Sequence, residues 1–158
     1  MVVNQIIKSI SEANLPPGSF VIEVDKDTIL TRLKISKSLN RSVKKMKLQF
    51  SMDHYDVSDN KLNYLKHVEL DFIKLNESLV RRIHDKPDHF GSVREIVEVA
   101  HRSGIEVIAS QVETARELAV LFEAGVDHIQ GYLIAEPSKQ LQSGVELDEI
   151  AEETGIEE

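Results

Sequence analysis

Hydrophobic and polar positions along the chain follow two alternating periods, and these predict a series of strands and helices. Short apolar runs predict strands at residues 20–24, 47–52, 71–76, 106–110 and 128–132. Apolar residues at helical spacing predict helices at the amino terminus (Ile6, Ile7, Ile10), over 27–42, around Leu62, Leu65 and Val68, over 92–103 and over 114–124. Strands that alternate with helices in this way indicate βαβ units and a parallel sheet.

The last two predicted helices carry signals for where they begin and end. Residues 92–95 (SVRE) and 114–117 (TARE) both fit a capping box, in which side chains accept from the free amides of the first turn. Gly104 and Gly125 follow these helices at the position where a left-handed residue commonly ends a helix. We therefore expect these two helices to be the most sharply bounded.

The order of elements predicts an α/β fold of the TIM-barrel type. Right-handed crossovers place the carboxyl ends of parallel strands on one rim, where barrel enzymes carry their sites. A complete (β/α)8 barrel needs eight strands and typically ~250 residues, whereas this chain has 158. We expect an incomplete (β/α)8 barrel with about five parallel strands.

Composition narrows the class of protein without assigning a function. A net charge of −8 argues against a nucleic-acid partner. The chain has no cysteine, so disulfides and thiolate metal sites are excluded. No apolar run approaches the ~20 residues of a membrane span, and the amino terminus lacks the apolar core of a signal peptide. We expect a protein of the cytoplasm with no membrane span.

The most informative stretch is residues 107–137, VIASQVETARELAVLFEAGVDHIQGYLIAEP. It resembles the closing part of an EAL domain, a family of barrels that hydrolyse the bacterial second messenger cyclic di-GMP. That family reads close to IAEGVET, then a helix ending in Gly, then QGY and a Pro. The matching positions are Ile108, Ala109, Val112, Glu113, Thr114, Gly125, Gln130, Gly131, Tyr132 and Pro137. Ser110 and Gln111 replace the acid-Gly pair of the pattern.

The resemblance covers about residues 1–140 and matches only the later two-thirds of that family. The segment with the Glu-Ala-Leu signature is expected upstream, so we interpret residues 1–140 as the C-terminal two-thirds of an EAL-like domain. Residues 141–158 are predicted to be a C-terminal helix or a frayed acidic tail, because 146–158 holds seven acids and no base.

The resemblance also implies site residues, position by position. Glu23 and Asp53 match carboxylates that bind metal in the family, which holds two divalent cations, usually Mg²⁺ or Mn²⁺. Such hard cations require oxygen ligands and generate a hydroxide aimed at the phosphodiester. Lys74 matches a Lys that contacts the attacking water or the phosphate. The implied ligand-binding residues are Ser110, Gln111, Glu113, Gln130 and Gly131.

Three departures from the family remove acids from this implied site. His54 and Asn76 each stand in place of an Asp, and Ser110 stands in place of a Glu. A neutral imidazole suits Mg²⁺ poorly, and serine lacks a carboxylate's charge. We expect Lys74, Glu23 and Asp53 to be vestigial, no metal cofactor in this chain, and Mg²⁺ or Mn²⁺ only if the protein is active.

Three functions stay open at this stage. The first is a degenerate, inactive EAL domain that acts as a cyclic di-GMP receptor, similar to the FimX-type subgroup, with PilZ-type or type IV pilus proteins as partners. The second is an active Mg²⁺-dependent phosphodiesterase. The third is a protein-interaction domain without nucleotide, since an open sheet leaves edges for upstream domains of the same polypeptide or for a homodimer.

Overall fold

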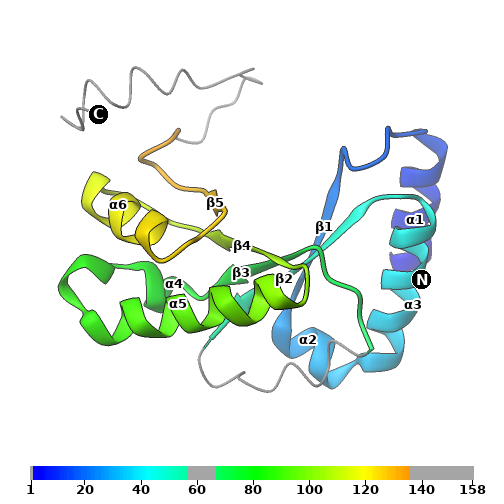
Figure 1. The fold of residues 1–158 in the computed structure, drawn as a ribbon. Coiled ribbons are helices and arrows are strands. Elements are labelled where there is room, and N and C mark those ends of the chain that lie inside the picture. Colours follow the sequence, from blue (N-terminus) through cyan, green and yellow to red (C-terminus); the bar gives the residue numbers. More distant parts are fainter. Residues whose placement is uncertain (1, 57–66, 136–158) are drawn as a thin grey trace.

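The computed structural model describes residues 2–56 and 67–135, and one parallel sheet runs through them (Figure 1). Its strands are β1 (Val21–Asp25), β2 (Gln49–Tyr55), β3 (Phe72–Leu75), β4 (Glu106–Ala109) and β5 (His128–Ile129). They lie in chain order, and each pairs in parallel with the next. The predicted fold class, an incomplete TIM-barrel-like sheet of five parallel strands, is confirmed.

Helices pack against the sheet along its whole width. They are α1 (Val2–Glu12), α2 (Lys26–Thr31), α3 (Leu33–Lys45), α4 (Glu77–Val80), the 3-10 helix η3 (Ile83–Asp85), α5 (Pro87–Arg102) and α6 (Ala115–Glu123). Figure 1 shows α1 and α3 beside the β1 end of the sheet, with α5 and α6 beside the β5 end. Strand residues that face the helices form the core, and Phe50, Met52, Ile73 and Val107 are at most 1% exposed.

The single helix predicted over residues 27–42 is wrong, because the chain forms two helices there. Arg32 leaves the helical conformation with φ −123° and ψ 44°, between α2 and α3. Ile29 on α2 and Val43 on α3 are both almost fully buried. The break allows each helix to direct its own apolar face at the core, a requirement that helical periodicity does not reveal.

The capping box predicted at Ser92 is also wrong. Helix α5 begins at Pro87, and the Ser92 hydroxyl donates to the carbonyl of Asp88 within the helix, at 2.8 Å. Proline is favoured in the first turn, and serine is tolerated inside a helix when it bonds to the carbonyl four residues back. The capping box at Thr114 and Glu117 is confirmed.

The remaining predictions of secondary structure have mixed outcomes. Gly104 and Gly125 adopt φ values of +71° and +89°, which confirms the predicted left-handed helix ends. The helix predicted around Leu62 and Leu65 and the proposed tail 141–158 lie outside the described residues. Within the described residues, none of the helices combines the length and hydrophobicity that a bilayer crossing requires.

An aspartate before β3 joins that strand to its neighbour through two contacts. The amide of Asp71 donates to the carbonyl of Phe50 at 2.9 Å, and its carboxylate accepts from the amide of Phe50 at 2.7 Å. Lys44 of α3 donates to the same carboxylate at 2.7 Å. This carboxylate therefore links β2, β3 and the helix that precedes β2.

Asp127, before β5, repeats the arrangement. Its amide donates to the carbonyl of Val107 at 3.0 Å, its carboxylate accepts from the amide of Val107 at 2.7 Å, and the ring of His101 on α5 lies 2.8 Å away. The two helix partners, Lys44 and His101, lie 57 positions apart, and so do the two strand partners, Phe50 and Val107. We call these two arrangements the aspartate clamps.

Removing a clamp is expected to destabilise the fold. Asp71→Ala leaves the Phe50 amide and Lys44 without their acceptor, and we expect a loss of about 2 to 3 kcal/mol in the free energy of unfolding. Urea denaturation measures this loss. Glu123→Ala, at an exposed position on α6, is the control and should stay within about 0.5 kcal/mol of the parent. An equal, small effect of both variants would contradict the role of the clamp.

Candidate functional site

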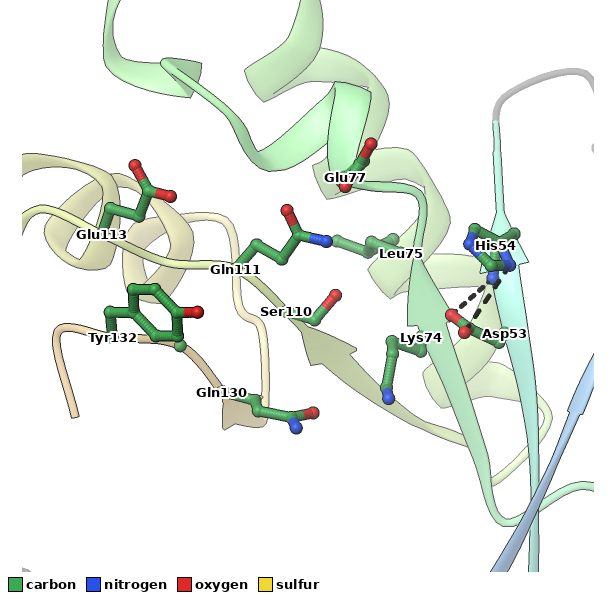
Figure 2. A pocket seen from close by; sticks show the side chains of 11 residues that line it. Asp53, His54, Lys74, Leu75, Glu77, Ser110, Gln111, Glu113, Gln130 and Tyr132 are labelled. Carbon is green, nitrogen blue, oxygen red and sulfur yellow. Dashed lines mark hydrogen bonds and ion pairs between the residues drawn. The ribbon is translucent and has the colours of Figure 1, made fainter. Parts of the chain in front are cut away.

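A cleft of about 480 Å³ opens at the carboxyl ends of the strands, where barrel folds carry their sites (Figure 2). Its size lies within the ~300–1,000 Å³ common for small-molecule sites. The lining residues are Asp53, His54, Lys74, Leu75, Glu77, Ser110, Gln111, Glu113, Gln130, Gly131 and Tyr132. Seven of the residues that the sequence predicted for a site, namely Asp53, Lys74, Ser110, Gln111, Glu113, Gln130 and Gly131, are thus brought to one place.

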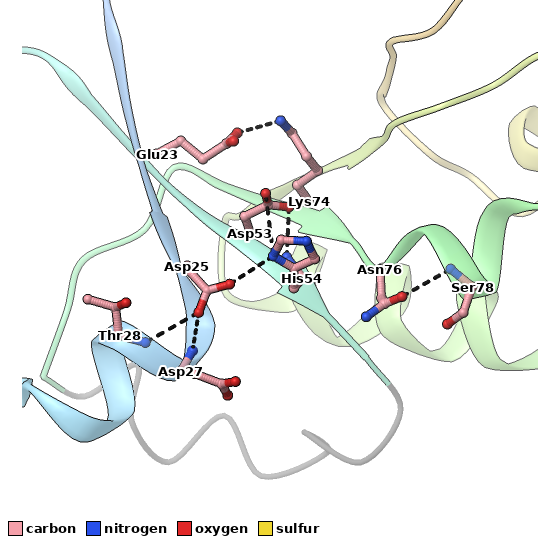
Figure 3. A network of polar contacts seen from close by, with 9 residues as sticks. All are labelled: Glu23, Asp25, Asp27, Thr28, Asp53, His54, Lys74, Asn76 and Ser78. Carbon is pink, nitrogen blue, oxygen red and sulfur yellow. Dashed lines mark hydrogen bonds and ion pairs between the residues drawn. The ribbon is translucent and has the colours of Figure 1, made fainter.

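At the end of β2, His54 is held by an aspartate on the neighbouring strand. The pairing of β2 with β3 is irregular between Met52 and Tyr55, and within this irregularity His54 adopts φ +59°. Its Nδ1 lies 2.8 Å from the Asp25 carboxylate and 3.6 Å from that of Asp53 (Figure 3). Because a carboxylate can only accept, Nδ1 carries the proton in this contact. The imidazole therefore ties β2 to β1.

Asp25 has a second structural task at the start of α2. Its carboxylate accepts from the amides of Asp27, at 2.8 Å, and Thr28, at 3.4 Å, and so caps the helix. Partial burial raises the pKa of the Asp25 carboxyl, but the bond from His54 and the two amide bonds outweigh it and leave the pKa below its ordinary value. The pair of Asp25 and His54 is engaged in local structure.

Lys74 and Glu23 form the closest ion pair near the cleft. The Lys74 ammonium lies 2.6 Å from a Glu23 carboxylate oxygen, and the two side chains are 13% and 38% exposed. Glu23 comes from β1 and Lys74 from β3, and Figure 3 shows the two side chains meeting across β2. Glu23 is not among the residues that line the cleft, but it reaches the cleft through Lys74.

The loop after β4 contains a left-handed residue that is not glycine. Gln111 has φ +59°, a conformation that costs an ordinary residue roughly 1 to 2 kcal/mol. This is the position where the resemblance expects Gly, so the backbone requirement is retained although the residue has changed. Figure 2 shows the carboxamide of Gln111 extending into the cleft beside Ser110 and Leu75. Residues under such strain cluster at functional sites.

The loop that carries Glu113 is anchored by a different acid, Glu117. Glu117 is 4% exposed, and its carboxylate accepts from the amides of Arg82 (2.7 Å), Glu113 (3.1 Å) and Thr114 (3.2 Å). Burial raises the pKa of Glu117, but these three amides and the Thr114 hydroxyl outweigh it and hold the pKa below its ordinary value. The side chain of Glu113 lines the cleft, while Glu117 joins this loop to the start of η3.

Gly131 is required by close contact between two backbone segments. The amide of Val112 donates to the carbonyl of Gln130 at 3.1 Å, and the amide of Leu133 donates to the carbonyl of Val112 at 3.2 Å. A Cβ at position 131 would lie 2.3 Å from the Val112 oxygen. The close approach of the Val112 backbone therefore leaves room only for glycine at position 131.

Several features of the cleft were absent from the sequence prediction. Glu77 and Leu75 flank the predicted end of β3, and Tyr132 belongs to the QGY pattern, but none was expected to line a site. Asn76, by contrast, does not line the cleft, because its side chain accepts from the amide of Ser78 at 3.0 Å and caps α4. The signal for Glu77 was its position directly after a predicted strand end.

The residues present do not fit a site for two divalent cations. Such a site needs several carboxylate oxygens free to converge. Of the two carboxylates that the resemblance assigns to metal, Glu23 is paired with Lys74 and Asp53 accepts from the amide of His54 at 2.7 Å. Ser110 and Asn76 offer no carboxylate, and no cluster of three or more His, Cys, Asp or Glu suited to a metal occurs among residues 2–56 and 67–135.

Comparison with known proteins shows what this chain is similar to. The family model described as EAL domain matches residues 2–137. The cyclic di-GMP phosphodiesterase PdeR of Escherichia coli is 30% identical over 128 residues, 81% of this chain. The FimX EAL domain of Pseudomonas aeruginosa, solved bound to c-di-GMP, superposes with a TM-score of 0.79 and 27% identity over 88% of this chain. BlrP1 of Klebsiella pneumoniae, solved as a manganese/cy-diGMP complex, superposes with a TM-score of 0.75 and is 27% identical over 85% of this chain.

The matched regions are only parts of these relatives. The chain spans 19% of the length of PdeR, 57% of the FimX EAL chain and 34% of the BlrP1 chain. The likeness therefore concerns a portion of one domain.

The strain at Gln111 generates a stability prediction. Gln111→Gly relieves the strain of the left-handed conformation and should raise the free energy of unfolding by about 0.5 to 1 kcal/mol. The gain is not larger because glycine also increases the entropy of the unfolded chain. Gln111→Ala is the matched control, since it removes the side chain but retains the strain. Thermal or urea denaturation compares the two. Equal stability of the Gly and Ala variants would contradict strain at this position.

Glu117 generates a prediction that depends on pH. Glu117→Leu leaves three partly buried hydrogen bonds without their acceptor and should cost about 2 to 4 kcal/mol at neutral pH. Because the folded-state pKa is lowered, the carboxylate's contribution is present above the unfolded pKa and disappears as pH falls through the folded pKa. The difference between parent and variant should therefore shrink in acid, as urea melts at several pH values would measure. A difference independent of pH would show that the charge plays no part.

Proposed function

Because this chain belongs to the EAL domain family, we propose that it acts in cyclic di-GMP signalling as a receptor or regulatory module without phosphodiesterase activity. One observation carries the proposal. The polar residues implied for the nucleotide, among them Lys74, Glu113 and Gln130, line a single cleft, whereas the acids that catalysis requires are replaced. The finer assignment to a degenerate member rests on those replacements.

The contacts of the replaced positions support an inactive site. His54 bonds to Asp25, and Asn76 caps α4, so both side chains are occupied within the fold. Two-cation phosphodiester hydrolysis depends on metals that stabilise both the attacking and the leaving oxygen. With Glu23 engaged by Lys74 as well, little of that machinery is available from this chain's own residues.

The cleft offers groups suited to a cyclic dinucleotide. In the proposal, Lys74 faces a phosphate, and the carboxamides of Gln111 and Gln130 hydrogen-bond to the ligand beside Ser110. Tyr132 is 63% exposed at the cleft, and its ring provides a face on which a base can stack. Gly131 keeps the backbone close to Val112, which leaves this part of the rim open to ligand.

The wider setting is proposed from the likeness to FimX and from the exposed sheet edge. The proposed partners are upstream domains of the same polypeptide, PilZ-type or type IV pilus proteins, and a second copy of the chain. The proposed location is the cytoplasm. Support for an additional partner is that Phe20 and Val21, at edge strand β1, are 46% and 41% exposed. Exposed edges of this kind are commonly covered by another chain or domain.

Calorimetric titration with cyclic di-GMP tests the receptor function. We expect heat of binding without added metal, and Gln130→Ala should weaken binding about tenfold, as loss of one or two hydrogen bonds implies. Glu98→Gln, on the exposed side of α5 and away from the cleft, should bind as the parent does. Absence of heat at tens of micromolar ligand would refute the receptor.

Mass spectrometry for the linear product pGpG tests the inactive state in the same samples. We expect intact cyclic di-GMP after prolonged incubation with Mg²⁺ or Mn²⁺. Clear turnover would overturn this part of the proposal in favour of the active phosphodiesterase, and binding would then report an enzyme–substrate complex.

A further inference from the structure

The charges of the cleft are unfavourable for an anion. Among the described lining residues, Asp53, Glu77 and Glu113 are acids and Lys74 is the one lysine or arginine. The one lysine and the three carboxylates of the lining sum to −2. A phosphodiester that enters this cleft therefore depends on Lys74 for attraction.

Lys74 is not available without cost, because Glu23 already holds it. The 2.6 Å separation is that of a short, charge-assisted hydrogen bond. The lysine side chain is 13% exposed, so water screens the pair only partly. Glu23 itself stands on β1, outside the lining of the cleft. It acts on the cleft through its hold on the lysine.

The surroundings of the pair favour its persistence. Ser51 of β2 is in register with Glu23, is 0% exposed, and its hydroxyl has no hydrogen-bond partner among the described residues. The hydroxyl of Ser51, the β2 residue paired with Glu23, thus provides no competing contact. An incoming phosphate oxygen is the competitor that would draw the ammonium towards the cleft.

We propose that Glu23 is an internal competitor for the phosphodiester and sets the affinity of the cleft for anionic ligands by sequestering Lys74. This inference rests on the proposed receptor function. Glu23 holds the ammonium group of Lys74, whereas the family resemblance assigns it a metal cation. The effect of Glu23 on the affinity for an anionic ligand is therefore reversed. A metal bound by carboxylates attracts phosphate, whereas a lysine neutralised by a carboxylate attracts it less.

Glu23→Gln is the direct test, because glutamine keeps the shape and an acceptor oxygen while removing the negative charge. Titration of the full chain with cyclic di-GMP should show a dissociation constant about tenfold lower than that of the parent. Glu77→Gln also removes an acid from the cleft, but it has no contact with Lys74 in the structure and should change affinity less. Glu12→Gln, paired with Lys8 on exposed α1, controls for net charge.

A second pair of variants separates sequestration from a general effect of charge. Lys74→Met should weaken binding, and on that background Glu23→Gln should lose most of its benefit, since the two residues act as a unit. If Glu23→Gln melts at a lower temperature than the parent, Glu23→Met supplies an uncharged side chain of similar length for the same cycle.

The outcomes distinguish this inference from the proposed function. If the parent binds and Glu23→Gln binds equally or more weakly, the competitor role is overturned while the receptor stands. If Glu23→Gln improves binding equally in the parent and in the Lys74→Met background, the improvement comes from charge alone. Sequestration of Lys74 is then overturned. If no variant binds cyclic di-GMP, the receptor function fails and the competitor role fails with it.

Discussion

The hydrogen bonds that each aspartate clamp makes to the preceding strand are the contacts on which the rest of the structure depends. They lie where the strands begin, whereas the cleft lies where the strands end. In a parallel sheet, the register set at one end constrains the pairing of the residues that follow, and β4 and β5 pair without a register shift. The position of Ser110 relative to Gln130, where β4 and β5 end, thus depends on the Asp127 carboxylate at the far end of the same strands.

The polar side chains beside the cleft are held by contacts within the fold. Polar side chains of a folded chain usually have hydrogen-bond partners, and here the partners are nearby helix ends and strands. His54 bonds to the aspartate that caps α2, and Asn76 caps α4. These contacts stabilise the rim, so a ligand that recruited either side chain would have to break an existing bond.

Periodicity predicted the strands, their order and the parallel sheet, because alternating burial leaves a direct record in the sequence. Local capping chemistry was predictable at Thr114, where side chain and backbone are neighbours in sequence. It failed at Ser92, because Pro87 begins the helix earlier. The break at Arg32 and the pairing of Glu23 with Lys74 depend on how distant elements pack and register. Nothing within a short window of residues contains that information. Most of the residues that line the cleft were predictable through the family resemblance, but the net charge of the lining was not.

The nearly equal spacing of the two clamps has a consequence for how the domain is organised. The helix and strand partners recur after 57 positions and the aspartates after 56, so the β2–β3 and β4–β5 segments follow one plan. Each segment carries its own carboxylate for setting register, so a change at one clamp leaves the other intact. The two segments meet at the backbone of Asp71, whose carbonyl accepts from the amide of Glu106 at 3.0 Å.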